Sequence, residues 1–155
     1  IFAGIAAGIA VASLLNSALV EKLGSRLISH SALIGFIGFS TLHAVIAVTG
    51  HDSLWMFSIL QGLKMFCFGL TMGNFGSMAM EPMGRIAGTA SSLQGFISTI
   101  GGAVLGFIIG QSFDGTTVPL TVGFSVLSII ALLLVLWAEQ GKLFKSRHSS
   151  HKPVT

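Results

Sequence analysis

Lys64 is the residue of this chain most suited to binding a substrate or another charge, because it is a charged side chain in the middle of a long apolar run. Gln61 lies one helical turn before it, and Asn74 lies on the same polar side further along. A Lys at the centre of a membrane helix costs at least about 2.5 kcal/mol on insertion scales, so it should face a bundle interior or water. Two interpretations stay open. Gln61, Lys64 and Asn74 could line a substrate cavity, or Lys64 could pair with another group or reach toward the membrane surface and only help to orient the helices.

The run that holds Lys64, about residues 53–78, has two chemically different faces when it is drawn as a helix. Gly69 and Gly73 lie on the face opposite the polar residues, and glycine faces let membrane helices approach closely. The polar face needs a different neighbour, which is water, a ligand or a polar side chain. Ser53 or Asp52 is placed to cap the start of this helix.

The next run, about residues 86–112, carries a stripe of small residues along one side. Its last part is a doubled G-x-x-x-G pattern, which is typical of a tight helix–helix contact. A functional interpretation adds that the helix could slide or rock against its neighbour. The glycines of the stripe are Gly88, Gly95, Gly102, Gly106 and Gly110.

Composition and motifs argue against a soluble enzyme. The chain of 155 residues is 52% hydrophobic and only 8% charged, whereas soluble domains carry about 25% charged residues. The sequence has no phosphate loop, dinucleotide fingerprint or Cys/His metal cluster, so we expect no enzyme activity, no cofactor and no metal. Ser40 and His43 are three residues apart on one helix, which poorly fits the separate helices of an intramembrane protease dyad. A lone membrane His such as His43 is more often a hydrogen-bond partner between helices than a proton carrier.

Five runs are long and apolar enough to cross a bilayer, for which a helix needs about 20 residues. The predicted fold is therefore an all-α polytopic membrane protein with a membrane domain over residues 1–138 and a cytoplasmic, disordered tail over residues 139–155. The predicted helices span about residues 1–20, 27–49, 53–78, 86–112 and 118–138.

The basic residues predict the orientation of these helices. Seven of the eight Lys and Arg residues lie in the first break, the third break or the tail, and Asp52 and Asp114 mark the other two breaks. This alternation is the positive-inside pattern, so the tail and the basic breaks should be cytoplasmic. Five spans would then leave Ile1 on the outer face, and we expect the chain to be the C-terminal part of a longer protein. The net charge of +3 is a topology signal and does not indicate nucleic acid.

The first break resembles a loop signature of the major facilitator superfamily, G-x-x-x-D-R-x-G-R-R, in degenerate form. Ser17 replaces its leading Gly, and the following positions are Glu21, Lys22, Gly24 and Arg26. The resemblance implies that charges at these positions latch cytoplasmic helix ends in one state of a transport cycle.

A longer stretch, from Asn74 to Leu120, is similar to the bicyclomycin/chloramphenicol-resistance (Bcr/CflA) branch of the drug:proton antiporters. The likeness lies in Asn74-Phe75, Glu81-Pro82 and the run that begins at Gly88. It implies spans eight to twelve of a twelve-helix fold in a bacterial inner membrane, with alternating access between two six-helix halves. The family exports small amphiphilic drugs in exchange for protons, and its acidic coupling residue lies in the N-terminal half.

The sequence hypothesis is therefore a C-terminal fragment of a proton-driven multidrug efflux transporter. Its partners would be the lipid bilayer, the missing N-terminal half, a small amphiphilic drug or metabolite, and protons. Because the deep spans hold no Asp or Glu, a coupling carboxylate would lie in the missing part, or Lys64 or His43 would take that role. The alternative is a non-transporting five-span scaffold or assembly subunit, which the small-residue seams fit equally well.

Overall fold

The computed structural model describes residues 2–141, 143 and 144, and these residues form helices joined by short turns. Five α-helices follow one another, with a short 3-10 helix between the third and the fourth. Most of the predicted tail, including Lys142, Lys145, Arg147 and Lys152, lies outside the described residues. The elements are α1 (Phe2–Leu23), α2 (Ser25–Val48), α3 (Leu54–Met80), η1 (Glu81–Ile86), α4 (Ala87–Gln111) and α5 (Val118–Ala138).

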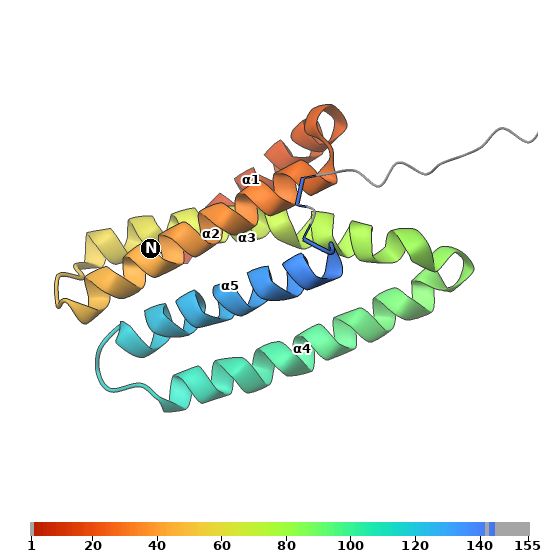
Figure 1. Cartoon of the computed structure of the whole chain (residues 1–155). Coiled ribbons are helices and arrows are strands. Elements are labelled where there is room, and N and C mark those ends of the chain that lie inside the picture. Colours follow the sequence, from red (N-terminus) through yellow and green to blue (C-terminus); the bar gives the residue numbers. More distant parts are fainter. Residues whose placement is uncertain (1, 142, 145–155) are drawn as a thin grey trace, which may run out of the picture.

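Four helical segments of the described chain are long and apolar enough to cross a membrane: Ile5–Leu23, Ser25–Val48, Leu54–Gln111 and Val118–Ala138. The predicted count of five is not confirmed, because α3, η1 and α4 run on as one helical segment without a break. That segment reverses its direction at η1, so α4 returns antiparallel to α3 (Figure 1). Gly84 within η1 has φ 46° and ψ −117°, a conformation that favours glycine and that permits the reversal.

The ends of the helices follow local chemistry. The Ser53 hydroxyl accepts a hydrogen bond from the Met56 N–H at 3.3 Å, as expected for the cap of α3. Pro119 lies in the first turn of α5, where its missing N–H costs no intrahelical hydrogen bond. The first predicted break, residues 21–26, is shorter than expected. Gly24 alone, at φ 80°, separates α1 from α2, because its positive φ turns the chain within one residue.

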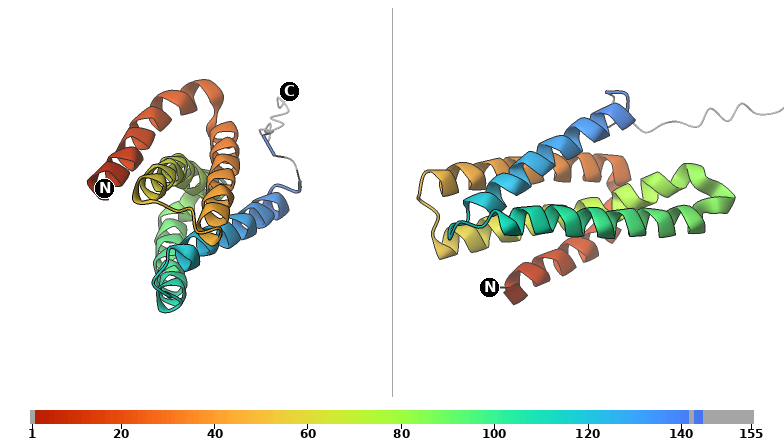
Figure 2. Two further views of the ribbon diagram at one scale, coloured as in Figure 1. Left: turned by 90° about the vertical axis from the view of Figure 1, so that its left-hand side faces the viewer. Right: turned by 90° about the horizontal axis from the view of Figure 1, so that it is seen from below.

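The helices α2 and α3 form the centre of the molecule. Helix α1 packs against α3, and α5 packs against α2, so α1 and α5 lie on different sides of the central pair (Figure 2). Helix α4 touches its neighbours mainly near its two ends and has no buried residue. The molecule therefore has a packed side, built from α1, α2, α3 and α5, and a loosely attached helix α4.

Candidate functional site

Lys64 is completely buried in α3. It lies ten residues after the start of α3 at Leu54, which is about 15 Å along the helix axis. Side chains on a helix lean toward its N-terminus, which for α3 is the end next to the α2–α3 loop. The Nζ atom lies 4.7 Å from the centre of the Phe124 ring on α5, at cation–π distance. No hydrogen-bond partner for this Nζ exists among the described residues.

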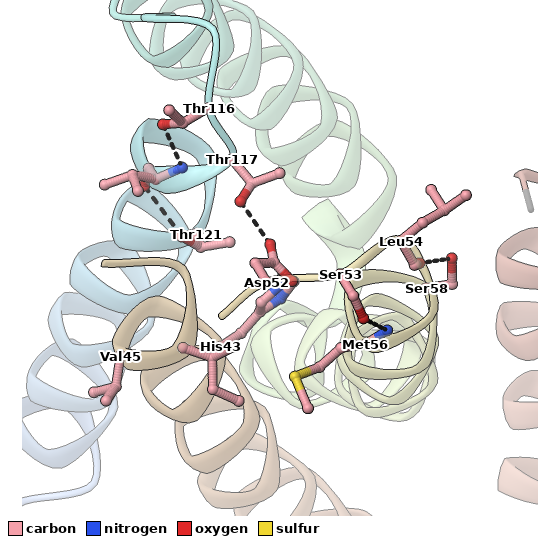
Figure 3. A network of polar contacts seen from close by, with 12 residues as sticks. His43, Val45, Asp52, Ser53, Leu54, Met56, Ser58, Thr116, Thr117 and Thr121 are labelled. Carbon is pink, nitrogen blue, oxygen red and sulfur yellow. Dashed lines mark hydrogen bonds and ion pairs between the residues drawn. The ribbon is translucent and has the colours of Figure 1, made fainter. Parts of the chain in front are cut away.

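A buried acid–base pair lies at the same end of the bundle as the start of α3. The Asp52 Oδ2 atom, in the α2–α3 loop, lies 3.4 Å from the Nε2 atom of His43 on α2. This is an ion-pair distance, but the geometry is not that of a hydrogen bond. The hydroxyl of Thr117, at the start of α5, donates to the same Asp52 oxygen at 2.6 Å (Figure 3). Asp52 therefore ties the loop before α3 to the start of α5.

His43 is held firmly in place although it makes no hydrogen bond within the described part of the chain. Its side chain is fully buried, and its ring meets the edge of Phe57 with the centroids 5.2 Å apart. The Asp52 side chain keeps only 8% of its surface exposed. We refer to His43, Asp52, Lys64 and Thr117 as the outer polar cluster, since the sequence predicts that this end of the bundle faces away from the cytoplasm.

The two other predicted cavity residues lie in different surroundings. Gln61 is half-buried one turn before Lys64, and its Oε1 atom has no hydrogen-bond partner among the residues described. Asn74 lies ten residues beyond Lys64, about 15 Å further along α3. Its Nδ2 atom donates to Asn16 Oδ1 at 2.6 Å and to the Leu70 carbonyl at 2.7 Å. Asn74 thus joins α3 to α1, and the structure does not bring it together with Lys64.

An apolar groove of about 610 Å³ runs between α2, α3, α4 and α5. Phe68 lies in its wall, and Phe124 lines it from α5. Gln94 and Ser98 of α4 add polar groups to the opposite wall. Phe124 also lies against Lys64, so the same aromatic ring lines the groove and contacts the buried cation.

The residues of the predicted loop motif lie at the other end of the bundle. Arg26, in the first turn of α2, forms an ion pair with Glu139 at the end of α5. Glu21 and Lys22 are exposed in the last turn of α1, and Gly24 forms the turn between the two helices. Of the charged residues in this motif, Arg26 alone forms an ion pair within the described part of the chain.

The predicted packing glycines divide into two groups. A Cβ atom on Gly69 would lie 3.0 Å from the Ala12 Cβ and 3.3 Å from the Ile9 carbonyl, so α1 and α3 meet closely there. Gly73 faces Asn16 at a looser 4.0 Å. A Cβ atom on any of the five glycines predicted to pack along α4 would meet no described neighbour within 4 Å; these are Gly88, Gly95, Gly102, Gly106 and Gly110.

Two features were not found by sequence reasoning. His30, on α2, is 1% exposed, and its Nδ1 atom accepts a hydrogen bond from the Phe144 N–H at 3.0 Å. A second histidine within an apolar run was the available signal. The second feature is the pairing of His43 with Asp52. The sequence signal for it was a carboxylate in the loop that follows the helix of His43.

The comparisons with known proteins give no family assignment for this chain. No protein-family model matches it, and no curated protein or solved structure matches it significantly. A functional hypothesis for this chain therefore rests on its residues and their arrangement.

Proposed function

We propose that the chain is the C-terminal part of a proton-driven multidrug efflux transporter of the bacterial inner membrane. In this proposal α3 and α4 cross the bilayer separately, which gives five spans that correspond to spans eight to twelve of a major facilitator fold. The membrane character of the helices, the sequence likeness and the Arg26–Glu139 pair between helix ends support it. The exposed face of α4 would pack against the missing N-terminal half.

The observation that carries the proposal is the groove beside Lys64. Aromatic and aliphatic side chains line it, and Phe124 connects it to a buried cation. An aromatic wall with few polar groups suits a small amphiphilic compound, because most ligand sites are apolar with a small number of placed polar contacts. Gln94 and Ser98 would orient the polar end of such a compound.

Efflux of ethidium from bacterial cells tests this proposal. The reading frame that contains this chain would be expressed as the wild type, as Phe124→Ala and as Phe68→Ala. An aromatic contact is worth roughly 0.5–1.5 kcal/mol, so each variant should export the dye roughly two- to tenfold less effectively. Phe113→Ala is the matched control, since Phe113 lies in the α4–α5 loop and is 70% exposed.

The rival hypothesis, a scaffold or assembly subunit, makes the opposite prediction. Cells that express the wild type would then retain ethidium like cells without it, and dissipating the proton gradient would change nothing. Proton-dependent efflux that Phe124→Ala weakens and Phe113→Ala leaves intact would support the transporter. Efflux that is equal in all variants would remove the groove as the substrate site.

A further inference from the structure

The outer polar cluster offers one carboxylate to two basic side chains. Asp52 Oδ2 lies 3.4 Å from His43 Nε2, and the buried ammonium of Lys64 has no hydrogen-bond partner among the described residues. Like charges disfavour each other, so a positive Lys64 opposes a positive charge on His43. We propose that this cluster is a proton-binding site, in which His43 takes up one exchangeable proton and competes with Lys64 for the charge of Asp52.

The charge balance of the cluster explains why one proton matters. With Lys64 as an ammonium, Asp52 as a carboxylate and His43 neutral, the cluster carries no net charge. When a ring nitrogen of His43 forms an N–H bond with a proton from outer water, the net charge becomes +1. The imidazolium then faces the carboxylate at ion-pair distance, and Lys64 loses part of its compensation. An uncompensated ammonium in an apolar interior is unfavourable, so proton uptake favours movement of Lys64 or the arrival of an anionic group beside it.

The surroundings leave His43 as the switching group. The packed helix α5 presents Thr117 and Phe124 to the cluster and no titratable side chain. His51 and Asp114 lie in the adjoining loops, and both are exposed. The cluster can exchange with outer water through Asp52, because that residue is in a loop and keeps part of its side chain exposed. A histidine is suited to this role, because its ordinary pKa lies within the physiological range of pH.

The contrast with His30 sharpens the assignment. Both histidines are buried on α2, but His30 Nδ1 accepts a hydrogen bond from a backbone N–H, and its ring lies tilted against Phe75 and edge-on to Phe144. That hydrogen bond requires an unprotonated nitrogen at Nδ1. His43 has a carboxylate at ion-pair distance in place of a backbone donor. The same residue type on the same helix is therefore placed for two different uses.

Nitrogen-15 NMR of the histidine rings in the full chain, held in phospholipid nanodiscs, tests the proposal between pH 8 and pH 4.5. We expect one buried histidine resonance to titrate, to disappear in His43→Gln and to persist in the matched control His30→Gln. Lys64→Met and Asp52→Asn should move its midpoint in opposite directions, because one removes a positive neighbour and the other a negative one. A neighbouring charge shifts such a midpoint by about one unit or more, which is a tenfold change in proton affinity.

Several outcomes would overturn the proposal. One is a His43 resonance that stays neutral throughout this range of pH. Another is a midpoint that neither Lys64→Met nor Asp52→Asn moves. If Asp52→Asn does not fold, Thr117→Val replaces it, since that variant removes the 2.6 Å hydrogen bond to the carboxylate and keeps its charge. The inference extends the proposed function, which supplies the outer orientation, but the NMR readout needs no transport, so either can fail alone.

Discussion

Helices α3 and α4 look alike in the sequence and differ completely in their surroundings. Both combine glycines and polar residues with large apolar ones, although α3 has its glycines opposite its polar residues and α4 has both along one side. The polar face of α3 is its buried face, since Lys64, Cys67, Thr71 and Asn74 are all buried. No residue of α4 is buried against the described chain. The comparison teaches that a helical pattern shows which face can take a partner, whereas the partner itself comes from the rest of the fold.

The loops beside these two helices repeat the contrast. Asp52 precedes α3 and is nearly buried, with His43 and Thr117 from two other segments around its carboxylate. Asp114 follows α4 and is exposed, and its carboxylate accepts hydrogen bonds only from its neighbour Thr116 among the described residues. One aspartate joins distant elements, and the other organises its own turn. The expected effects of substitutions therefore fall in a definite order.

The largest loss of stability should come from replacing a glycine of α3 by leucine. In Gly69→Leu the added atoms would meet Ala12 and the Ile9 carbonyl at contact distance or closer, so α1 must move away. Overpacking of this kind costs about 1–3 kcal/mol of the free energy of unfolding. Unfolding of the purified chain in mixed micelles by a denaturing detergent measures this loss.

Gly106→Leu on α4 is the matched control, because a Cβ atom there meets no described atom within 4 Å. We expect its unfolding free energy to lie within about 0.5 kcal/mol of the wild type. Equal losses in the two variants would break the comparison. They would mean that α4 has a tight partner in the micelle, such as a second copy of the chain.

A smaller effect should come from the amide pair between α1 and α3. Asn74 donates to Asn16 Oδ1 at 2.6 Å, and Asn16 Nδ2 approaches Asn74 Oδ1 at 3.4 Å. Polar contacts between membrane helices couple by about 0.6 kcal/mol on average and by less than about 2 kcal/mol. A double-mutant cycle with Asn16→Leu and Asn74→Leu should give a coupling in this range.

Thr99 on α4 supplies the comparison for that cycle. Its hydroxyl bonds only to the Gly95 carbonyl of its own helix within the described chain. Thr99→Val combined with Asn16→Leu should therefore give no measurable coupling. Coupling of similar size in both cycles would show that the unfolding signal reports the whole bundle and not the α1–α3 contact.

Much of the packed side could be predicted from the sequence, because local chemistry determines it. Ser53 caps α3 as expected, and the polar face around Lys64 is buried as its composition requires. The close approach at Gly69 also follows from a small residue on a helix surface. Such features need only the neighbours along one helix.

Other features required the fold. Asp52 pairs with His43 only because the chain reverses between α2 and α3 and brings α5 beside both. The sequence pattern predicts Asn74 in the same cavity as Lys64, but Asn74 bonds to Asn16 because α1 packs against that part of α3. A helical wheel shows the directions in which the side chains of one helix point around its axis. It does not show which neighbouring helix supplies their partners. The predicted seam along α4 stays a prediction for the same reason.

The smallest effect is a change in the pKa of Asp114. It tests whether the α4–α5 loop is held by its own hydrogen bonds, independently of the contacts around Asp52. Hydrogen bonds from the hydroxyl and the backbone N–H of Thr116 hold the pKa of this exposed carboxyl below its usual range. Thr116→Val removes the hydroxyl donor, so the pKa of Asp114 should rise toward the ordinary value. Because a lowered pKa stabilises the folded loop above the ordinary carboxyl pKa, this contribution is lost as the pH falls through the lowered value. Carbon-13 NMR of the Asp114 carboxyl follows the change directly.

Thr117→Val is the control, since the Thr117 hydroxyl bonds to Asp52. If that variant shifted the Asp114 titration as much as Thr116→Val does, the two aspartates would be electrostatically linked across the loops, and α4 would be less independent of the packed side than its exposed surface implies.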